Sequence, residues 1–278
     1  MTPAQAEARV EDCGDHLRVT LSNPGRRNAL APSMYVSLRE ALEQAAAEDR
    51  LGAVVLTGAD GYFCTGGDLN ALATRAAMSR DERRALIEDL HATIRAIRAC
   101  PRPVIAAVEG AAAGAGLSIA LACDVLVAAE DAAFAAAYVR VGLVPDGGLT
   151  ALLARRVPET LAARMCLTGD PVAASVLAGL GVVTDLAAPG QAIARATELA
   201  ARFAQGPAAA QAAIKRLLAE AREGRFDDQL DREGDAMADA LAGAEAAAGL
   251  RARLNRAAPD FGRRRPPPQE RTGKEADQ

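Results

Sequence analysis

The sequence PVIAAVEGAAAGAGLSIALACD, residues 103–124, is the stretch that decides the fold. Its residues 104–108 form a short apolar run with β-branched side chains, which predicts a buried strand. Residues 115–122 carry no charge and predict a buried helix. Glycines mark the approach to this helix and its first turn, at Gly110, Gly114 and Gly116. The first N–H groups of a helix have no intrahelical partner, and glycine lets a ligand approach the backbone, so this loop is expected to bind an anion.

Three interpretations of the loop compete. The glycine spacing matches the nucleotide loop of short-chain dehydrogenases, and Glu130 follows the next strand at about the place of an acidic ribose ligand. Alternatively, the loop binds an oxyanion that develops on a carbonyl during a reaction. The third interpretation is a buried turn in which glycine only permits close packing. The loop alone does not choose among them.

The composition is typical of a soluble globular protein. The 278 residues are 50% hydrophobic and 24% charged, and the net charge of −4 gives no indication of a nucleic-acid interface. The five cysteines are scattered and lie mostly in apolar runs, which indicates reduced core residues of a cytoplasmic protein. With only two histidines and no Cys-x-x-Cys pair, no metal site is expected. The first residues do not resemble a signal peptide, and the longest uncharged stretch is too short and glycine-rich to cross a membrane.

Hydrophobic periodicity divides the chain into a long α/β part and a helical end. Apolar runs predict strands at residues 16–21, 53–57, 104–108 and 124–128. Amphipathic spacing and turn residues predict helices at residues 34–47, 72–99, 115–122, 150–156, 191–205, 207–222 and 227–256. A strand–strand–helix rhythm indicates a spiral α/β core. We therefore expect a core at residues 9–200, a helical region at 201–260, loose residues 1–8 and a disordered tail at 262–278.

A second glycine bend precedes the first in the chain. In the segment GYFCTGGDL, residues 61–69, Phe63 and Cys64 are expected to be extended, the two glycines to form a bend, and Asp68 to open a helix. Backbone N–H groups are exposed at this bend as at the later one. The simplest alternative is an ordinary turn with Asp68 as the N-cap.

Taken together and in order, these motifs resemble the crotonase superfamily of enoyl-CoA hydratases and isomerases. The resemblance rests on Arg27-Asn-Ala-Leu30, Phe63-Cys-Thr-Gly-Gly-Asp-Leu69, residues 103–110, Gly114-Ala-Gly116, Ala122-Cys-Asp124, Ala132-Ala-Phe134, residues 142–148 and Gly206-Pro207. The dehydrogenase interpretation fails on separate grounds. Its loop normally opens the chain, and neither of the two lysines, Lys215 and Lys274, follows a tyrosine in a Tyr-x-x-x-Lys pair.

The resemblance implies an α/β fold, the crotonase (ClpP-like) spiral of ββα units. In that fold C-terminal helices contact other subunits, giving a homotrimer or hexamer. The resemblance also implies an acyl-CoA thioester as the ligand, with no cofactor besides the CoA that the substrate carries and with no nucleic-acid or membrane partner. The oxyanion hole would be formed by the N–H groups of Gly67 and Ala115, one from each bend. Removing a proton beside a thioester places negative charge on its oxygen, and two fixed donors stabilise that charge.

Two positions depart from the pattern of the family's hydratases, which hold a water with two glutamates. This chain has Ser118 and Tyr138 there, and neither hydroxyl is a base near neutral pH. The carboxylate in a family-typical position is Asp146, although a turn residue that caps the next helix would look the same. In family isomerases an acid at this loop moves a proton between C2 and C4, so Asp146 is the expected base of an enoyl-CoA isomerase. The alternatives are a hydratase with atypical catalytic residues and an acyl-CoA-binding protein without chemistry.

The resemblance also implies the remaining contacts with the substrate. The expected substrate-binding residues are Arg27, Ala29, Thr65, Gly66, Asp68, Leu69, Gly114, Ser118 and Tyr138. Arg26 and Arg27 are candidates for the CoA phosphates. Family members also use a C-terminal aromatic and a lysine of a neighbouring subunit, and this chain has Arg253, Arg256 and Phe261 in that region. Acyl specificity is expected in the helical segment around residues 70–90.

Overall fold

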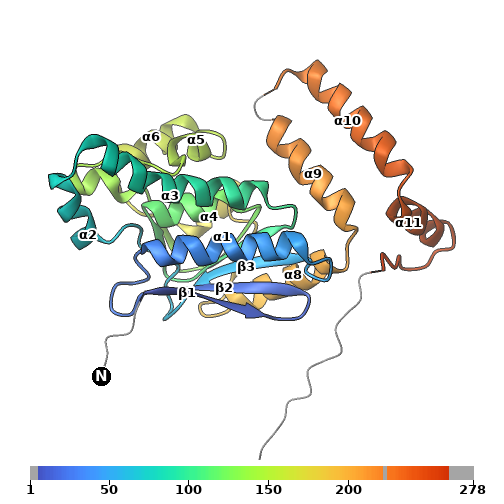
Figure 1. Cartoon of the computed structure of the whole chain (residues 1–278), viewed down its shortest axis with the longest axis horizontal. Coiled ribbons are helices and arrows are strands. Elements are labelled where there is room, and N and C mark those ends of the chain that lie inside the picture. Colours follow the sequence, from blue (N-terminus) through green and yellow to red (C-terminus); the bar gives the residue numbers. More distant parts are fainter. Residues whose placement is uncertain (1–5, 222–223, 263–278) are drawn as a thin grey trace, which may run out of the picture.

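A six-stranded sheet forms the centre of the computed structural model, which describes residues 6–221 and 224–262 (Figure 1). Its strands, in spatial order, are β1 (Glu7–Asp12), β2 (His16–Ser22), β3 (Ala53–Gly58), β4 (Val104–Val108), β6 (Val125–Ala129) and β9 (Asp185–Ala187). Neighbours from β2 to β9 are parallel, and β1 is antiparallel to β2. The central strands β3 and β4 are buried throughout, which explains their continuous apolar runs.

A second, smaller sheet leads into the glycine bend at Gly114 and lies beside the other bend. It comprises β5 (Ala111–Ala113), β7 (Ala133–Ala135) and β8 (Val172–Ala173), with β5 parallel to β7 and β7 antiparallel to β8. Two isolated parallel bridges, from Cys64 to Ala112 and from Leu30 to Gly67, align two further segments with this layer. Residues 64–67 therefore run beside β5 in the same direction.

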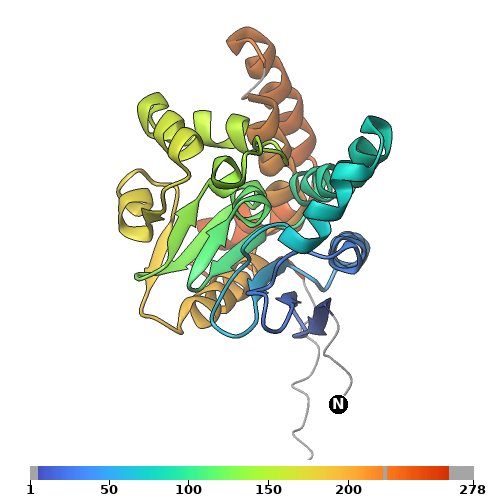
Figure 2. The ribbon, with the colours of Figure 1, turned by 90° about the vertical axis from the view of Figure 1, so that its left-hand side faces the viewer.

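Helices cover both faces of the large sheet (Figures 1 and 2). On one face, buried side chains of α1 (Pro32–Ala47), α3 (Arg80–Ala99) and α4 (Ala115–Ala122) form the main core cluster. Every second residue of the strands, such as Val54 and Leu56, packs into this cluster. The other alternate residues, such as Ala53 and Val55, form a second cluster with α8 (Ala192–Ala204). The buried face of α8 consists of alanines, so this helix can lie close to the sheet.

The remaining helices lie at the edge of the core or beyond it. They are α2 (Leu69–Thr74), η1 (Arg75–Ala77), η2 (Ala137–Val141), α5 (Leu149–Ala154), α6 (Glu159–Thr168) and α7 (Ala174–Gly179), followed by α9 (Ala208–Ala221), α10 (Phe226–Leu241) and α11 (Ala244–Leu254). The last three form an arm that extends away from the sheet (Figure 1).

Lys215 of α9 fastens the arm to the core. Its Nζ lies 2.6 Å from Asp124 Oδ2 and donates to the carbonyls of Ile97 (3.1 Å) and Arg102 (3.3 Å). Burial raises the pKa of Asp124, and the charge of Lys215 opposes that rise.

Most predicted elements are confirmed, and α4 begins and ends as expected, but three expectations are wrong. β1 begins at Glu7, within the segment expected to be loose; it is an edge strand whose side chains are mostly exposed, so it carries little hydrophobic signal. The helix expected at residues 72–99 is broken before Ser79, whose side chain and that of Glu82 form a capping box. The helix expected at 227–256 is interrupted at Gly243. The tail expected to be disordered lies, from residue 263 onward, outside the described residues.

Glu109 anchors the N-terminal end of α8 by hydrogen bonds, and this role can be tested by mutation. This buried carboxylate accepts the N–H groups of Gly190 (3.0 Å) and Ala192 (2.8 Å) at the start of the helix. Glu109→Gln replaces one acceptor by a donor, so we expect the free energy of unfolding to fall by about 2 kcal/mol. Urea denaturation followed by circular dichroism measures this, with the exposed Glu130→Gln as the matched control. Coincident unfolding curves for the two variants would contradict this role of Glu109.

Candidate active site

Two parallel segments end side by side, and each continues through a glycine bend into a helix. Cys64 N–H donates to the Ala111 carbonyl (3.1 Å), and Ala113 N–H donates to the Cys64 carbonyl (2.9 Å). After these segments α2 begins at Leu69 and α4 at Ala115. Because the carboxyl ends of parallel strands meet at one edge, the two bends and the two helix N-termini lie together.

The bends are in direct contact, and their glycines make that contact possible. A Cβ on Gly66, whose φ is +94°, would lie 2.9 Å from the Ala113 oxygen and 3.1 Å from the Ala115 nitrogen. A Cβ on Gly116 would lie 2.4 Å from the Cys64 oxygen. Side chains at either position would push the two segments apart.

The expected oxyanion donors, Gly67 and Ala115, therefore come from touching segments. Within residues 6–221 and 224–262, neither N–H has a backbone or side-chain acceptor. Ala115 is the first residue of α4, where the helix dipole is positive. The arrangement can stabilise negative charge on an oxygen placed between the two N–H groups.

Asp146 is held beside the second bend by a hydrogen-bond network. Tyr138 of η2 donates its hydroxyl to Asp146 Oδ1 at 2.7 Å, and Ser118 of α4 donates to the Asp146 carbonyl at 3.0 Å. The two hydroxyl oxygens are 3.4 Å apart. A Cβ on Gly114 would lie 4.0 Å from Tyr138 Cε2, so the ring of Tyr138 borders the bend that carries Ala115.

The protonation of this network leaves one candidate base. Burial raises the pKa of Tyr138, and the adjacent charge of Asp146 raises it further. Tyr138 is therefore protonated at physiological pH and serves as a donor. Ser118 is fully buried and has no acidic or basic partner in the network. Asp146 is thus the group of the three that can accept and return a proton.

The loop before residue 30 is fastened to the first bend. Leu30 N–H donates to the Gly66 carbonyl at 2.7 Å, and Thr65 N–H donates to the Arg27 carbonyl at 3.2 Å. Arg27 and Asn28 both have positive φ, at 46° and 57°. The buried Asn28 side chain compensates for this conformation, since it donates to two carbonyls of residues 59 and 62 and accepts the N–H of residue 23.

Arg26 and Arg27, the candidates for the CoA phosphates, both contact other side chains of the chain. Arg26 Nη1 lies 2.5 Å from Asp68 Oδ2, and Asp68 also caps α2 through the N–H groups of Asn70 and Ala71. Asp68 thus has the N-cap role that the sequence suggested. The Arg27 guanidinium lies 5.1 Å from the centroid of the Tyr62 ring.

The other expected contact residues differ in exposure. Ala29 is buried, and its carbonyl accepts from Asn23 at 2.7 Å. Leu69 is 61% exposed at the start of α2.

Tyr35 of α1 was not predicted for this region. It is half-buried, packs against the main core cluster and interacts electrostatically with Cys64 and Asp146. Burial, followed by these two neighbours, raises its pKa. The one sequence signal that could have identified it is the rarity of tyrosine, since the chain has three, Tyr35, Tyr62 and Tyr138.

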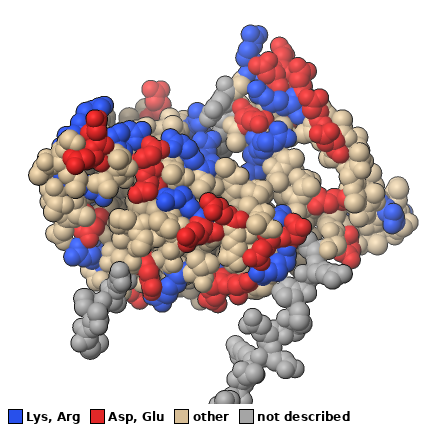
Figure 3. Space-filling model, viewed as in Figure 1, with Lys and Arg blue, Asp and Glu red and all other residues tan. Residues whose placement is uncertain are grey.

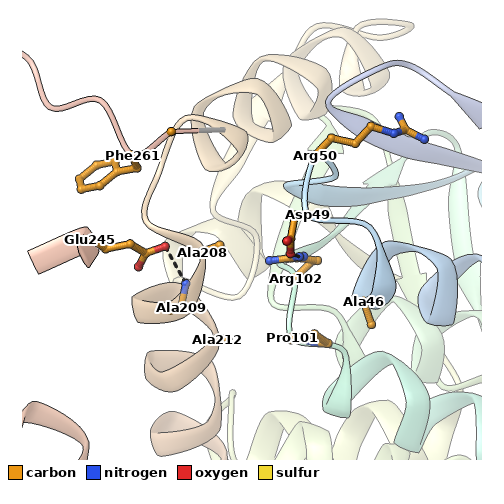
Figure 4. Close-up of a pocket in the computed structure, with 11 residues that line it drawn as sticks. Ala46, Asp49, Arg50, Pro101, Arg102, Ala208, Ala209, Ala212, Glu245 and Phe261 are labelled. Atoms are coloured by element: carbon orange, nitrogen blue, oxygen red, sulfur yellow. Dashed lines mark hydrogen bonds and ion pairs between the residues drawn. The ribbon is translucent and has the colours of Figure 1, made fainter. Parts of the chain in front are cut away.

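The C-terminal candidates lie elsewhere in the same chain. Phe261 lines a cavity of about 620 Å³ between the core and the arm, together with Ala46, Asp49 and Glu245, and no residue of either glycine bend lines it (Figure 4). Glu245 accepts the N–H groups of Ala209 and Ala210 at the start of α9. Arg253 and Arg256 are exposed at the end of α11 and beyond it. The structure does not bring these three residues to Gly67 and Ala115 of their own chain.

Two properties of the described chain limit the classes of site. None of its His, Cys, Asp and Glu residues gather in threes as metal ligands would, and no described helix has the length and apolarity needed to cross a membrane. Acidic and basic residues alternate over the visible face, without a continuous basic surface (Figure 3).

Known proteins resemble this chain over most of its length. Residues 16–264 match the family described as enoyl-CoA hydratase/isomerase. A probable enoyl-CoA hydratase from Rhodobacter capsulatus is 37% identical over 87% of this chain and 93% of its own. From Escherichia coli, a 2,3-dehydroadipyl-CoA hydratase is 34% identical and a 1,2-epoxyphenylacetyl-CoA isomerase 32% identical, each covering 88% of this chain and 94% of its own.

The solved structures agree. An enoyl-CoA hydratase from Polaromonas sp. JS666 has a TM-score of 0.90 at 40% identity, covering 91% of this chain and 99% of the other. This confirms the crotonase-type α/β fold expected from the motifs. The chain belongs to the enoyl-CoA hydratase/isomerase family of acyl-CoA-processing enzymes.

Proposed function

We propose that the chain converts 3-enoyl-CoA thioesters to 2-enoyl-CoA thioesters, with Asp146 as the single base. The Asp146 carboxylate removes a proton from C2, and the electron pair moves onto the thioester oxygen. The N–H groups of Gly67 and Ala115 stabilise the resulting dienolate. The protonated Asp146 then returns the proton to C4, so that the double bond moves from C3–C4 to C2–C3.

The observation that supports this proposal most is the hydrogen bond from Tyr138 to Asp146. It links the only carboxylate of the network to a tyrosine whose ring borders the bend that carries Ala115. Ser118 and Tyr138 stand where family hydratases have glutamates, and both act here as hydrogen-bond donors to Asp146. One carboxylate is sufficient for a reaction in which the same group takes and returns the proton.

Hydration remains the second candidate because most of the similar proteins are named as hydratases, among them those from Rhodobacter capsulatus and Polaromonas. It would require a second group to hold and activate the water. Binding of acyl-CoA without chemistry is the third candidate, since the chain lacks both glutamates.

Separate incubation with 3-enoyl-CoA and 2-enoyl-CoA distinguishes the three candidates by the absorbance of the conjugated thioester. Isomerisation produces an increase with 3-enoyl-CoA, whereas hydration produces a decrease with 2-enoyl-CoA. Measurable CoA binding without either change would indicate a binding protein. We expect the increase with 3-enoyl-CoA. Its absence with folded protein that binds CoA would overturn the proposal.

The proposed reaction needs no cofactor besides the CoA that the substrate carries. We also propose that the arm formed by α9, α10 and α11 contacts further copies of the chain in a homotrimer or hexamer. Its described apolar side chains include several large ones more than half exposed: Ile214, Leu218, Leu230, Met237, Leu241, Leu250 and Leu254. A reducing, cytoplasmic location is consistent with all five cysteines being free.

A further inference from the structure

One face of the α2–η1 segment is directed toward the interior and carries a charge. Among residues 69–77 only Leu72 and Arg75 are half-buried, while the others are exposed. They are three residues apart on continuous helical backbone, so their side chains lie on the same face. The Arg75 side chain makes no hydrogen bond or ion pair with any residue in the described part of the chain.

The same face begins at the expected oxyanion hole. Leu72 covers the first bend, since a Cβ on Gly67 would lie 3.1 Å from Leu72 Cδ1. At the helical rise per residue, Arg75 lies about 10 Å along the helix from the N-cap residue that follows Gly67. An extended octenedioyl chain has a length of this order.

Tyr35 interacts electrostatically with both the proposed base and Arg75. Its hydroxyl is within electrostatic range of Cys64 in the first bend, of Asp146 and of Arg75. It has no hydrogen-bond partner among the described residues, although it is half-buried. The nearby carboxylate of Asp89 faces Arg39, with 3.6 Å between Arg39 Nη2 and Asp89 Oδ1.

These positions define a path for the acyl chain. In the proposed reaction the thioester oxygen lies at the N–H groups of the two bends, and C2 to C4 lie at Asp146. The chain beyond C4 then passes Tyr35 and reaches Arg75. A half-buried arginine without an anionic partner favours a ligand that provides one, and guanidinium binds carboxylate through paired hydrogen bonds.

We propose that Arg75, with the Tyr35 hydroxyl, binds a carboxylate at the far end of the acyl group, so that the preferred substrates are dicarboxylic enoyl-CoA thioesters. This inference rests on the proposed isomerisation for its assay and on the geometry of α2, η1 and α1 for its substrate class. Arg75 determines which substrate is preferred and takes no part in the proton transfer.

The test compares 3-octenedioyl-CoA with 3-octenoyl-CoA, two substrates of equal chain length that differ only at the far end. We expect the wild-type kcat/KM to be at least about tenfold higher for the diacid. Arg75→Gln is expected to abolish this preference, and Arg75→Glu to reverse it. Arg80→Gln is the matched control, because the Arg80 side chain is 87% exposed on the neighbouring helix, and it should keep the wild-type ratio.

Calorimetric binding of octanedioyl-CoA and octanoyl-CoA separates failure of this inference from failure of the proposed reaction. An inactive protein that binds the diacid more tightly, and loses that preference in Arg75→Gln, would retain the carboxylate site without the isomerisation. Tyr35→Phe should weaken diacid binding and leave octanoyl-CoA binding less affected. Equal values for both ligands in the wild type, or an unchanged preference in Arg75→Gln, would overturn the inference.

Discussion

Asp146→Asn is expected to lower kcat for 3-enoyl-CoA by roughly 10³-fold, within the range that general acid–base catalysis supplies. The amide has nearly the same shape as the carboxylate and its oxygen can still accept from the Tyr138 hydroxyl, which is 2.7 Å from the carboxylate in the wild type. The loop geometry is therefore retained, but the group no longer accepts a proton from C2. The loss should appear in kcat, with little change in affinity for the thioester.

The measurement is the initial rate of conjugated-thioester formation, together with CoA binding by calorimetry. Asp131→Asn is the matched control, because Asp131 is an exposed loop residue outside the network, and its kcat should equal that of the wild type. Undiminished turnover in Asp146→Asn, with intact CoA binding, would exclude Asp146 as the base.

The sequence predicted those parts of the site whose chemistry is local. Each glycine bend is followed by a helix start, and glycine is needed there because of positive φ or close backbone approach, so both bends could be recognised from residue order alone. Asp146 lies in a Pro-Asp-Gly-Gly turn, and Gly147 has the positive φ expected in such a turn. The helix of residues 115–122 followed from an uncharged apolar run.

Other features depend on contacts between distant residues and carry no sequence signal. The contact between Gly66 and Ala115 arises from the pairing of Cys64 with Ala112, which neither segment encodes by itself. Tyr35 occupies an ordinary position on an amphipathic helix, and its proximity to Asp146 results from packing. The break before Ser79 is different, because the capping box of Ser79 and Glu82 was readable in the sequence but was obscured by continuous helical spacing.

Gly66→Ala is expected to reduce kcat by about 10² to 10³-fold, the cost of losing one oxyanion donor. The new Cβ would meet the Ala113 oxygen at 2.9 Å and the Ala115 nitrogen at 3.1 Å, both backbone atoms that cannot rotate away. The bend would have to move, and the separation of the Gly67 and Ala115 N–H groups would change with it. Because the dienolate needs both donors more than the bound thioester does, kcat should fall further than affinity.

Gly61→Ala provides the control for backbone strain. Gly61 has a φ of +74°, close to the +94° of Gly66, but a Cβ there would meet no atom within 4 Å. Both variants therefore carry the cost of a left-handed alanine, and only Gly66→Ala disturbs the contact between the bends. The thermal unfolding temperature should fall in both variants, and further in Gly66→Ala because of the backbone clash, while turnover should fall in Gly66→Ala alone. Equal kcat values in the two variants would show that the contact between the bends does not position the donors that bind the thioester oxygen. Proton transfer by Asp146 would then require other hydrogen-bond donors for that oxygen.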